Sequence, residues 1–169
     1  MTIKRWVITA CALAALWFGW RWLFPSDETQ IHRVLDRIAK AAGSGAAGES
    51  DVARIARSMS IRSALDPQIT VDAGPPFRAT SGRDVLIGTV ARLNTTMKDL
   101  EVRFADVQIS VDPSRTSAKV YTTAEALFHD ARGDRGLEAR ELDLTFRRLE
   151  GDWVVSHVAP VTTLRPVVP

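Results

Sequence analysis

The chain has 169 residues, of which 46% are hydrophobic and 25% are charged, with a formal net charge of +2 and a single cysteine. One cysteine excludes an internal disulfide framework. Three of the 22 basic residues lie in the first 24 positions, which leaves 19 basic against 20 acidic residues elsewhere. The positive net charge is therefore no evidence for nucleic-acid binding, which would need a concentrated basic face, and no nucleic-acid partner is predicted.

The first 24 residues predict a membrane anchor. Two basic residues precede an uncharged apolar run over residues 6–20, Arg21 interrupts it, and apolar residues resume through Phe24. A helix over residues 6–24 would rise about 28 Å, close to the roughly 30 Å hydrocarbon core, with Arg21 reaching the interface. Four of the five tryptophans lie near the ends of this segment, as in membrane-interface belts. The basic residues at its start favour a cytoplasmic N-terminus and an extracytoplasmic, periplasmic domain.

Two alternatives to an anchor remain open at this stage. A cleaved signal peptide would use the A-x-A pattern at 12–14, but would leave aromatic residues on a soluble terminus. A peripheral or buried helix is the other. The stretch 8–11 resembles a lipoprotein box, although only two apolar residues precede it, so its cysteine is interpreted as a small apolar residue. We predict an anchor over 1–25, a domain over 26–162 and a tail over 163–169.

Two helices are predicted next. Ser26 can cap the first, whose apolar residues between 31 and 42 follow helical spacing. A glycine-rich segment over 43–48 ends it. A second helix begins near Ser50 and carries four apolar residues on one face, namely Val52, Ile55, Ala56 and Met59.

A short strand and a third helix follow. Asp66-Pro67 breaks the helical pattern, and Ile69 alternates with Val71 as in a short strand. A proline turn and a brief extended piece near Phe77 come next. The sequence Gly82-Arg83-Asp84 then opens a helix with a buried stripe, made of Leu86, Val90, Leu93 and Met97.

From Leu100 onward the hydrophobic period changes to two, which predicts long antiparallel strands. A change of phase after Phe104 predicts a β-bulge near Ala105-Asp106. Further strands are expected over about 116–128, around 142–146 and over 153–159. Helices grouped before a strand meander predict an α+β fold, with three N-terminal helices packed on a curved, mostly antiparallel sheet.

This order of elements resembles the nuclear transport factor 2-like superfamily, which includes ketosteroid isomerases and polyketide cyclase-like proteins. Two stretches carry the resemblance. One runs from Leu65-Asp66-Pro67 to Gly82-Arg83-Asp84, and the other, over 144–157, ends in a charged glycine turn followed by Trp153 and a β-branched pair. The resemblance covers about 27–162. It implies a cone-shaped roll with a cavity between sheet and helices, and it argues for fold more than for function.

The isomerase branch of this superfamily uses a carboxylate base with a tyrosine and a second carboxyl group as oxyanion donors. That chemistry makes Asp66, Tyr121 and His157 the catalytic candidates. Asp66 lies in an Asp-Pro pair typical of a turn. Tyr121 has the opposite phase to the apolar face of its strand. His157 shares a face with Trp153 and Val155 by alternation, and so could point into the cavity.

No metal site and no cofactor is predicted. The three histidines, His32, His129 and His157, lack metal-ligand spacing. The sequence contains no G-x-S-x-G element, glycine-rich phosphate loop or dinucleotide fingerprint.

Two functions remain open. The favoured one is a membrane-anchored, extracytoplasmic, non-catalytic binding or assembly module. Its expected partners are the bilayer through residues 6–24, a second copy of the chain through the sheet face, and an unknown protein or small apolar ligand. The alternative is a small-molecule enzyme of the isomerase or dehydratase type that uses the cone cavity.

Overall fold

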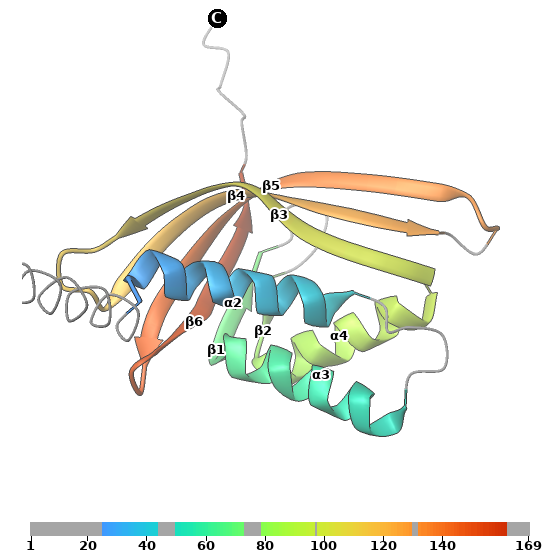
Figure 1. The fold of residues 1–169 in the computed structure, drawn as a ribbon, viewed down its shortest axis with the longest axis horizontal. Coiled ribbons are helices and arrows are strands. Elements are labelled where there is room, and N and C mark those ends of the chain that lie inside the picture. The colour runs from blue at the N-terminus through green and yellow to red at the C-terminus, as the bar shows by residue number, and fades with distance from the viewer. Residues whose placement is uncertain (1–24, 44–49, 73–78, 97, 130–131, 162–169) are drawn as a thin grey trace, which may run out of the picture.

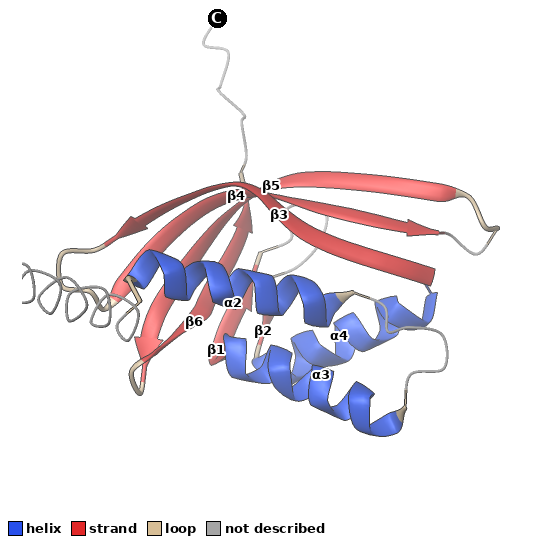
Figure 2. Cartoon of the chain, viewed as in Figure 1, coloured by secondary structure: helices blue, strands red, loops and turns tan. Residues whose placement is uncertain are grey.

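In the residues that it describes, the computed structural model contains three helices packed against one face of a six-stranded sheet (Figure 1, Figure 2). It describes residues 25–43, 50–72, 79–96, 98–129 and 132–161. Residues 1–24 of the predicted anchor and the whole predicted tail lie outside these ranges. Among the helices in these ranges, none is long and apolar enough to span a membrane.

The first two predicted helices begin at the predicted serines. Helix α2 (Asp27–Ala42) follows Ser26, and helix α3 (Asp51–Ala64) follows Ser50. Each serine Oγ accepts a backbone N–H from three residues further along at 3.2 Å. These bonds satisfy amide groups that have no partner within the helix, so the local sequence alone fixes both starts.

A hairpin separates α3 from the third helix. Strand β1 (Leu65–Val71) pairs antiparallel with strand β2 (Thr80–Ser81). Gly82 follows with φ of +96°, a conformation that costs glycine little, and helix α4 (Arg83–Thr96) begins directly after it. The predicted short strand and the predicted start of the third helix are confirmed. The strand also includes the Asp66-Pro67 pair, because proline and the residue before it favour extended backbone.

Four long strands complete the sheet. They are β3 (Lys98–Val111), β4 (Ser117–His129), β5 (Arg135–Leu149) and β6 (Asp152–Pro160). The strand order is β2-β1-β6-β5-β4-β3, and only the β1–β6 pair is parallel. Figure 1 shows the sheet curving over the helices. The predicted α+β class and the curved, mostly antiparallel sheet are confirmed.

The predicted β-bulge is also confirmed. The register between β3 and β4 shifts between Ala105 and Gln108, and Asp106 has φ of 52°. The Thr122 hydroxyl, which is fully buried, donates to the Ala105 carbonyl oxygen at 2.8 Å. This bond satisfies a carbonyl group at the bulge, and the bulge itself bends the strand.

The core lies between α2 and the concave face of the sheet. Ile31 and Leu35 of α2 pack with Val120 of β4 and Phe146 of β5, and each of the four is at most 2% exposed. Helical spacing on one side and two-residue alternation on the other bring these apolar faces together.

Helix α3 is oriented differently from the usual amphipathic pattern. Its face of four apolar residues points to solvent: Val52 is 76% exposed, Ile55 55% and Met59 64%, and Ala56 is exposed as well. The buried part of the helix begins only at Ile61. An apolar helix face normally packs on the core, so spacing alone does not identify which face of α3 is buried.

Candidate functional site

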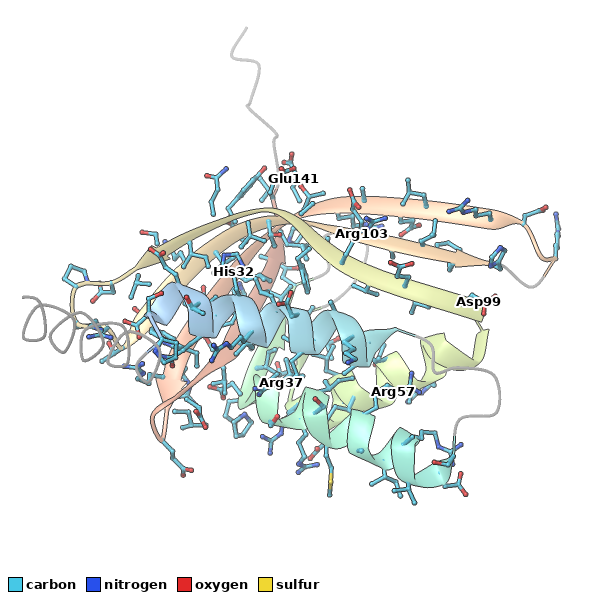
Figure 3. The ribbon with its side chains drawn as sticks, in the orientation of Figure 1. His32, Arg37, Arg57, Asp99, Arg103 and Glu141 are labelled. Carbon is cyan, nitrogen blue, oxygen red and sulfur yellow. The ribbon has the colours of Figure 1, made fainter. Side chains whose placement is uncertain are left out.

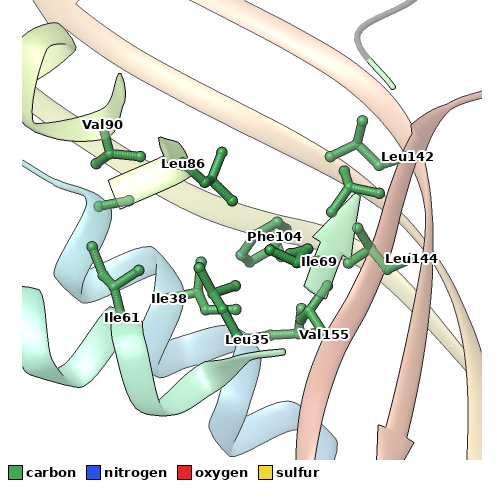
Figure 4. A pocket seen from close by; sticks show the side chains of 13 residues that line it. Leu35, Ile38, Ile61, Ile69, Leu86, Val90, Phe104, Leu142, Leu144 and Val155 are labelled. Carbon is green, nitrogen blue, oxygen red and sulfur yellow. The ribbon is translucent and has the colours of Figure 1, made fainter. Parts of the chain in front are cut away.

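A cavity of about 180 Å³ lies between the helices and the sheet (Figure 4). All three helices and strands β1, β3, β5 and β6 contribute to its wall. Every described residue that lines it is apolar: Leu35, Ile38, Ala42, Ile61, Leu65, Ile69, Leu86, Val90, Phe104, Leu142, Leu144, Val155 and Val158.

The sequence places these side chains in the cavity by simple periodicity. Leu35, Ile38 and Ala42 are three and four residues apart on α2, so they share one helix face. Leu142 and Leu144 are two apart on β5 and therefore share one sheet face. The cone cavity implied by the resemblance is thus present, and its wall comes from the same alternating pattern that predicted the strands.

The described wall of this cavity offers apolar contact. A general acid or base must come within hydrogen-bond reach of the proton it moves. None of the described lining residues carries a titratable side chain. Apolar hollows accept apolar molecules. The lining therefore suits holding a hydrocarbon group rather than transferring a proton.

Asp66 lies beside the cavity wall but is engaged elsewhere. Its side chain is 2% exposed and forms an ion pair with Arg147 through Arg147 Nε. Its Oδ1 accepts the backbone N–H of Gln68 at 2.7 Å, which is an Asx turn. The carboxylate therefore holds the irregular start of β1, in agreement with the turn predicted at Asp66-Pro67.

Tyr121 lies on the opposite face of β4 from the cavity, as its phase predicts. Its neighbours Val120 and Thr122 are both fully buried on the concave side. A hydrogen bond to Glu141, together with burial, raises the pKa of the Tyr121 hydroxyl. Figure 3 shows Glu141 on the side of the sheet away from the helices. This phenol is therefore outside the cavity and remains neutral.

His157 does not point into the cavity, contrary to the expected face. The register between β5 and β6 shifts between Val155 and His157, so Ser156 is an extra residue in the alternation. Val155 and Val158 line the cavity, and His157 does not. Its Nδ1 lies 2.7 Å from the Thr70 hydroxyl on β1. The bulge reverses the alternation from which the face was predicted.

Sequence reasoning missed a polar cluster at the start of α2. Asp27 is 8% exposed and accepts hydrogen bonds from Arg115 Nε at 2.6 Å, Arg148 Nη2 at 2.8 Å and Trp153 Nε1 at 3.3 Å. The Arg148 guanidinium also lies 5.0 Å from the Trp153 ring centroid. The hydrogen bond from Arg115 and the other donors hold the pKa of Asp27 below its ordinary value. The cluster ties the first turn of α2 to the turn between β3 and β4 and to strands β5 and β6.

The three candidates are not brought together in one site. Asp66 pairs with β5, Tyr121 with Glu141, and His157 with β1. In the described part of the chain, no three His, Cys, Asp or Glu side chains gather as a metal site requires.

The fold is similar to that of solved proteins with low sequence identity. A candidate scytalone dehydratase from Novosphingobium aromaticivorans matches with a TM-score of 0.65 at 16% identity, over 82% of this chain and 85% of that chain. A candidate aromatic ring hydroxylase from the same organism matches with a TM-score of 0.64 at 11% identity, over 82% and 90%. A candidate polyketide cyclase from Xanthomonas campestris matches with a TM-score of 0.51 at 12% identity, over 82% and 94%.

These likenesses confirm the nuclear transport factor 2-like fold that the order of elements predicted. At such identities they show the fold alone, since one fold hosts many functions. Comparison with protein-family models and with curated protein sequences finds no match.

Proposed function

We propose that this domain binds a small apolar molecule in the cavity between its helices and sheet, without chemistry on that molecule. The apolar lining carries the proposal, since every described residue in the wall is a hydrocarbon side chain. Each Å² of apolar surface that a ligand buries there is worth about 25 cal/mol. A wall of this kind selects for shape and apolarity and supplies no proton donor or acceptor.

The second candidate is an isomerase or dehydratase-type enzyme that uses the same cavity. The names of the structural neighbours, a candidate dehydratase and a candidate polyketide cyclase, favour it. Against it stand the positions of Asp66, Tyr121 and His157, each of which is engaged with a partner outside the cavity wall.

Residues 6–24 are proposed to anchor the domain in a membrane, on its extracytoplasmic side, because this stretch is apolar and rich in tryptophan. Alkaline extraction of membranes tests the anchor: the chain should stay with the lipid, and release into the soluble fraction would contradict it.

A homodimer through the outer sheet face is proposed as well. That face is polar, with ion pairs such as Arg103 to Glu125 at 3.2 Å, so it would form a hydrated interface.

Ligand binding is tested by NMR on the full-length chain in nanodiscs, with ¹³C-methyl-labelled isoleucine. During titration with 1-octanol, the signals of the cavity residues Ile38, Ile61 and Ile69 should shift and saturate together. Ile55 is the internal control because its side chain lies in solvent. Shifts that fail to saturate, or that are as large at Ile55, would contradict binding in the cavity.

Exchange of a carbon-bound proton separates the two functions. An isomerase-type site abstracts a proton next to a carbonyl group, so it would speed deuterium uptake into 2-octanone in D₂O. A binding site without a base should leave exchange at the rate of empty nanodiscs. Uptake above that rate would favour the enzyme.

A further inference from the structure

A second hollow, of about 200 Å³, lies in a groove between α3 and α4. Ile61 of α3 and Val90 of α4 line both this groove and the apolar cavity. Figure 4 shows these two residues on the same side of the cavity. Ile61 and Val90 therefore lie between the groove and the cavity.

The orientation of α3 directs two arginines to the groove. Arg54 and Arg57 line it together with Ile61, because positions three and seven residues apart share a helix face. The apolar face containing Ile55 and Met59 points to solvent instead. The helix thus places two of its arginines along the groove, while its large apolar side chains lie in water.

The two guanidinium groups differ in how firmly they are held. Arg57 donates through Nη1 to the Gly43 carbonyl oxygen at the end of α2, which fixes it between the helices (Figure 3). Arg54 pairs with Asp51 at 2.6 Å, and both of these side chains are well exposed. An exposed ion pair contributes little, so a ligand carboxylate can replace Asp51 at low cost.

The floor of the groove is apolar. Ile87 and Ala91 of α4 and Ala41 of α2 line it, and Ser58 of α3 is the polar residue beside the two arginines. A molecule in this groove therefore meets both positive charge and hydrocarbon surface. Guanidinium groups match carboxylates in planar, two-bond geometry.

We infer that the groove binds the anionic head group of a single-chain amphiphile whose apolar chain occupies the cavity. This inference rests on the proposed function, because it needs the cavity to accept an apolar chain. It adds the chemical class of the ligand and the two residues that recognise it.

The test compares octanoate with 1-octanol, which has the same chain length and no charge. Isoleucine-methyl NMR on the full-length chain in nanodiscs gives a dissociation constant for each, with empty nanodiscs to correct for partitioning into lipid. In the double variant Arg54→Gln/Arg57→Gln, the dissociation constant of octanoate should rise about fivefold. That of 1-octanol should stay unchanged, which also shows that the variant is folded.

The matched control is Arg33→Gln/Arg37→Gln. These two arginines lie four residues apart on α2 and line a different hollow. The control removes the same charge and should change neither dissociation constant. Equal effects on octanoate in both double variants would mean bulk electrostatics and would overturn the inference.

The remaining outcomes distinguish failure of the head-group site from failure of the proposed binding in the cavity. If the Arg54/Arg57 variant binds octanoate as the native chain does, or loses both ligands equally, the head-group site is wrong while cavity binding stands. If neither ligand shifts the methyl signals of Ile38 and Ile69, both the head-group site and the proposed function are wrong.

Discussion

Asp66, whose side chain is 2% exposed, forms its ion pair with Arg147, whose side chain is 47% exposed. The buried member of the pair is the carboxylate, and the Arg147 guanidinium reaches it from the solvent side. The residue that the resemblance would nominate as a base is thus an anion held by a structural cation. Because Asp66 is buried and Arg147 is not, the loss of each side chain should have a different effect on stability.

Substitution of Arg147 should therefore cost more stability than substitution of Asp66. Arg147→Met leaves a buried carboxylate without a counter-ion, which should lower the free energy of unfolding by about 2–4 kcal/mol. Asp66→Asn leaves an arginine whose guanidinium group can be hydrated by solvent, so the free energy of unfolding should fall by only about 1–2 kcal/mol. Urea unfolding followed by circular dichroism measures both. Arg103→Met is the control, since its pair with Glu125 is more exposed and should be worth less than about 1 kcal/mol. Equal costs for Arg147→Met and Asp66→Asn would contradict the account.

Acid should weaken the fold through Asp27. The hydrogen bond from Arg115 lowers the pKa of Asp27 below its ordinary value of 3.8. The hydrogen bond from Trp153 and the charge of Arg148 act in the same direction, whereas burial opposes them. A carboxyl group with a lowered folded-state pKa stabilises the fold above its unfolded pKa, and this contribution is lost as pH falls through the folded value.

The native chain should therefore lose stability below about pH 4 more steeply than Asp27→Asn does. Unfolding free energies of the two proteins between pH 2 and pH 7 give the difference directly, since the other carboxyl groups are common to both. Parallel curves would show that Asp27 does not contribute.

Two glycine substitutions should have opposite effects. A Cβ on Gly43 would lie 2.9 Å from the Leu100 carbonyl oxygen, so Gly43→Ala should force backbone apart and destabilise by about 1–2 kcal/mol. A Cβ on Gly88, within α4, meets no atom within 4 Å. Gly88→Ala should stabilise by about 0.5–1 kcal/mol, through helix propensity alone. Thermal unfolding of both variants tests this, and a loss of stability in Gly88→Ala would indicate that α4 packs differently.

The orientation of α3 can be tested with two isoleucines on the same helix. Ile61 is 6% exposed, so Ile61→Ala should cost about 2–4 kcal/mol. Ile55 is 55% exposed, so Ile55→Ala should change stability by no more than about 0.5 kcal/mol. The reverse order in urea unfolding would mean that the apolar face of α3 is the buried one.

The features that could be predicted from the sequence, namely two helix starts and one β-bulge, depend only on residues close together in the chain. Ser26 and Ser50 cap helices because a serine before a helical pattern satisfies nearby amide groups, whatever the rest of the chain does. The bulge at Ala105-Asp106 was visible because the hydrophobic alternation changes phase there.

Features that depend on distant parts of the chain were not predictable in the same way. The face of α3 follows from how α2 and α4 surround it, and spacing alone does not encode that choice. The bulge at Ser156 is not visible in the hydrophobic pattern, because valines come both before and after it in the chain. The predicted face of His157 was therefore wrong. The partners of Asp27 come from residues 88 to 126 positions away, and only its place in the first helical turn was visible.

Filling the cavity tests the central claim most directly. Ala42 lines the cavity, so Ala42→Leu adds hydrocarbon where the ligand chain would lie, while Ala56→Leu adds the same group on the exposed face of α3. The measurement is the dissociation constant of 1-octanol for the full-length chain in nanodiscs. We expect Ala42→Leu to weaken binding by about tenfold or more, and Ala56→Leu to leave it unchanged. Native affinity in a stably folded Ala42→Leu variant would contradict the claim that the cone cavity is the binding site.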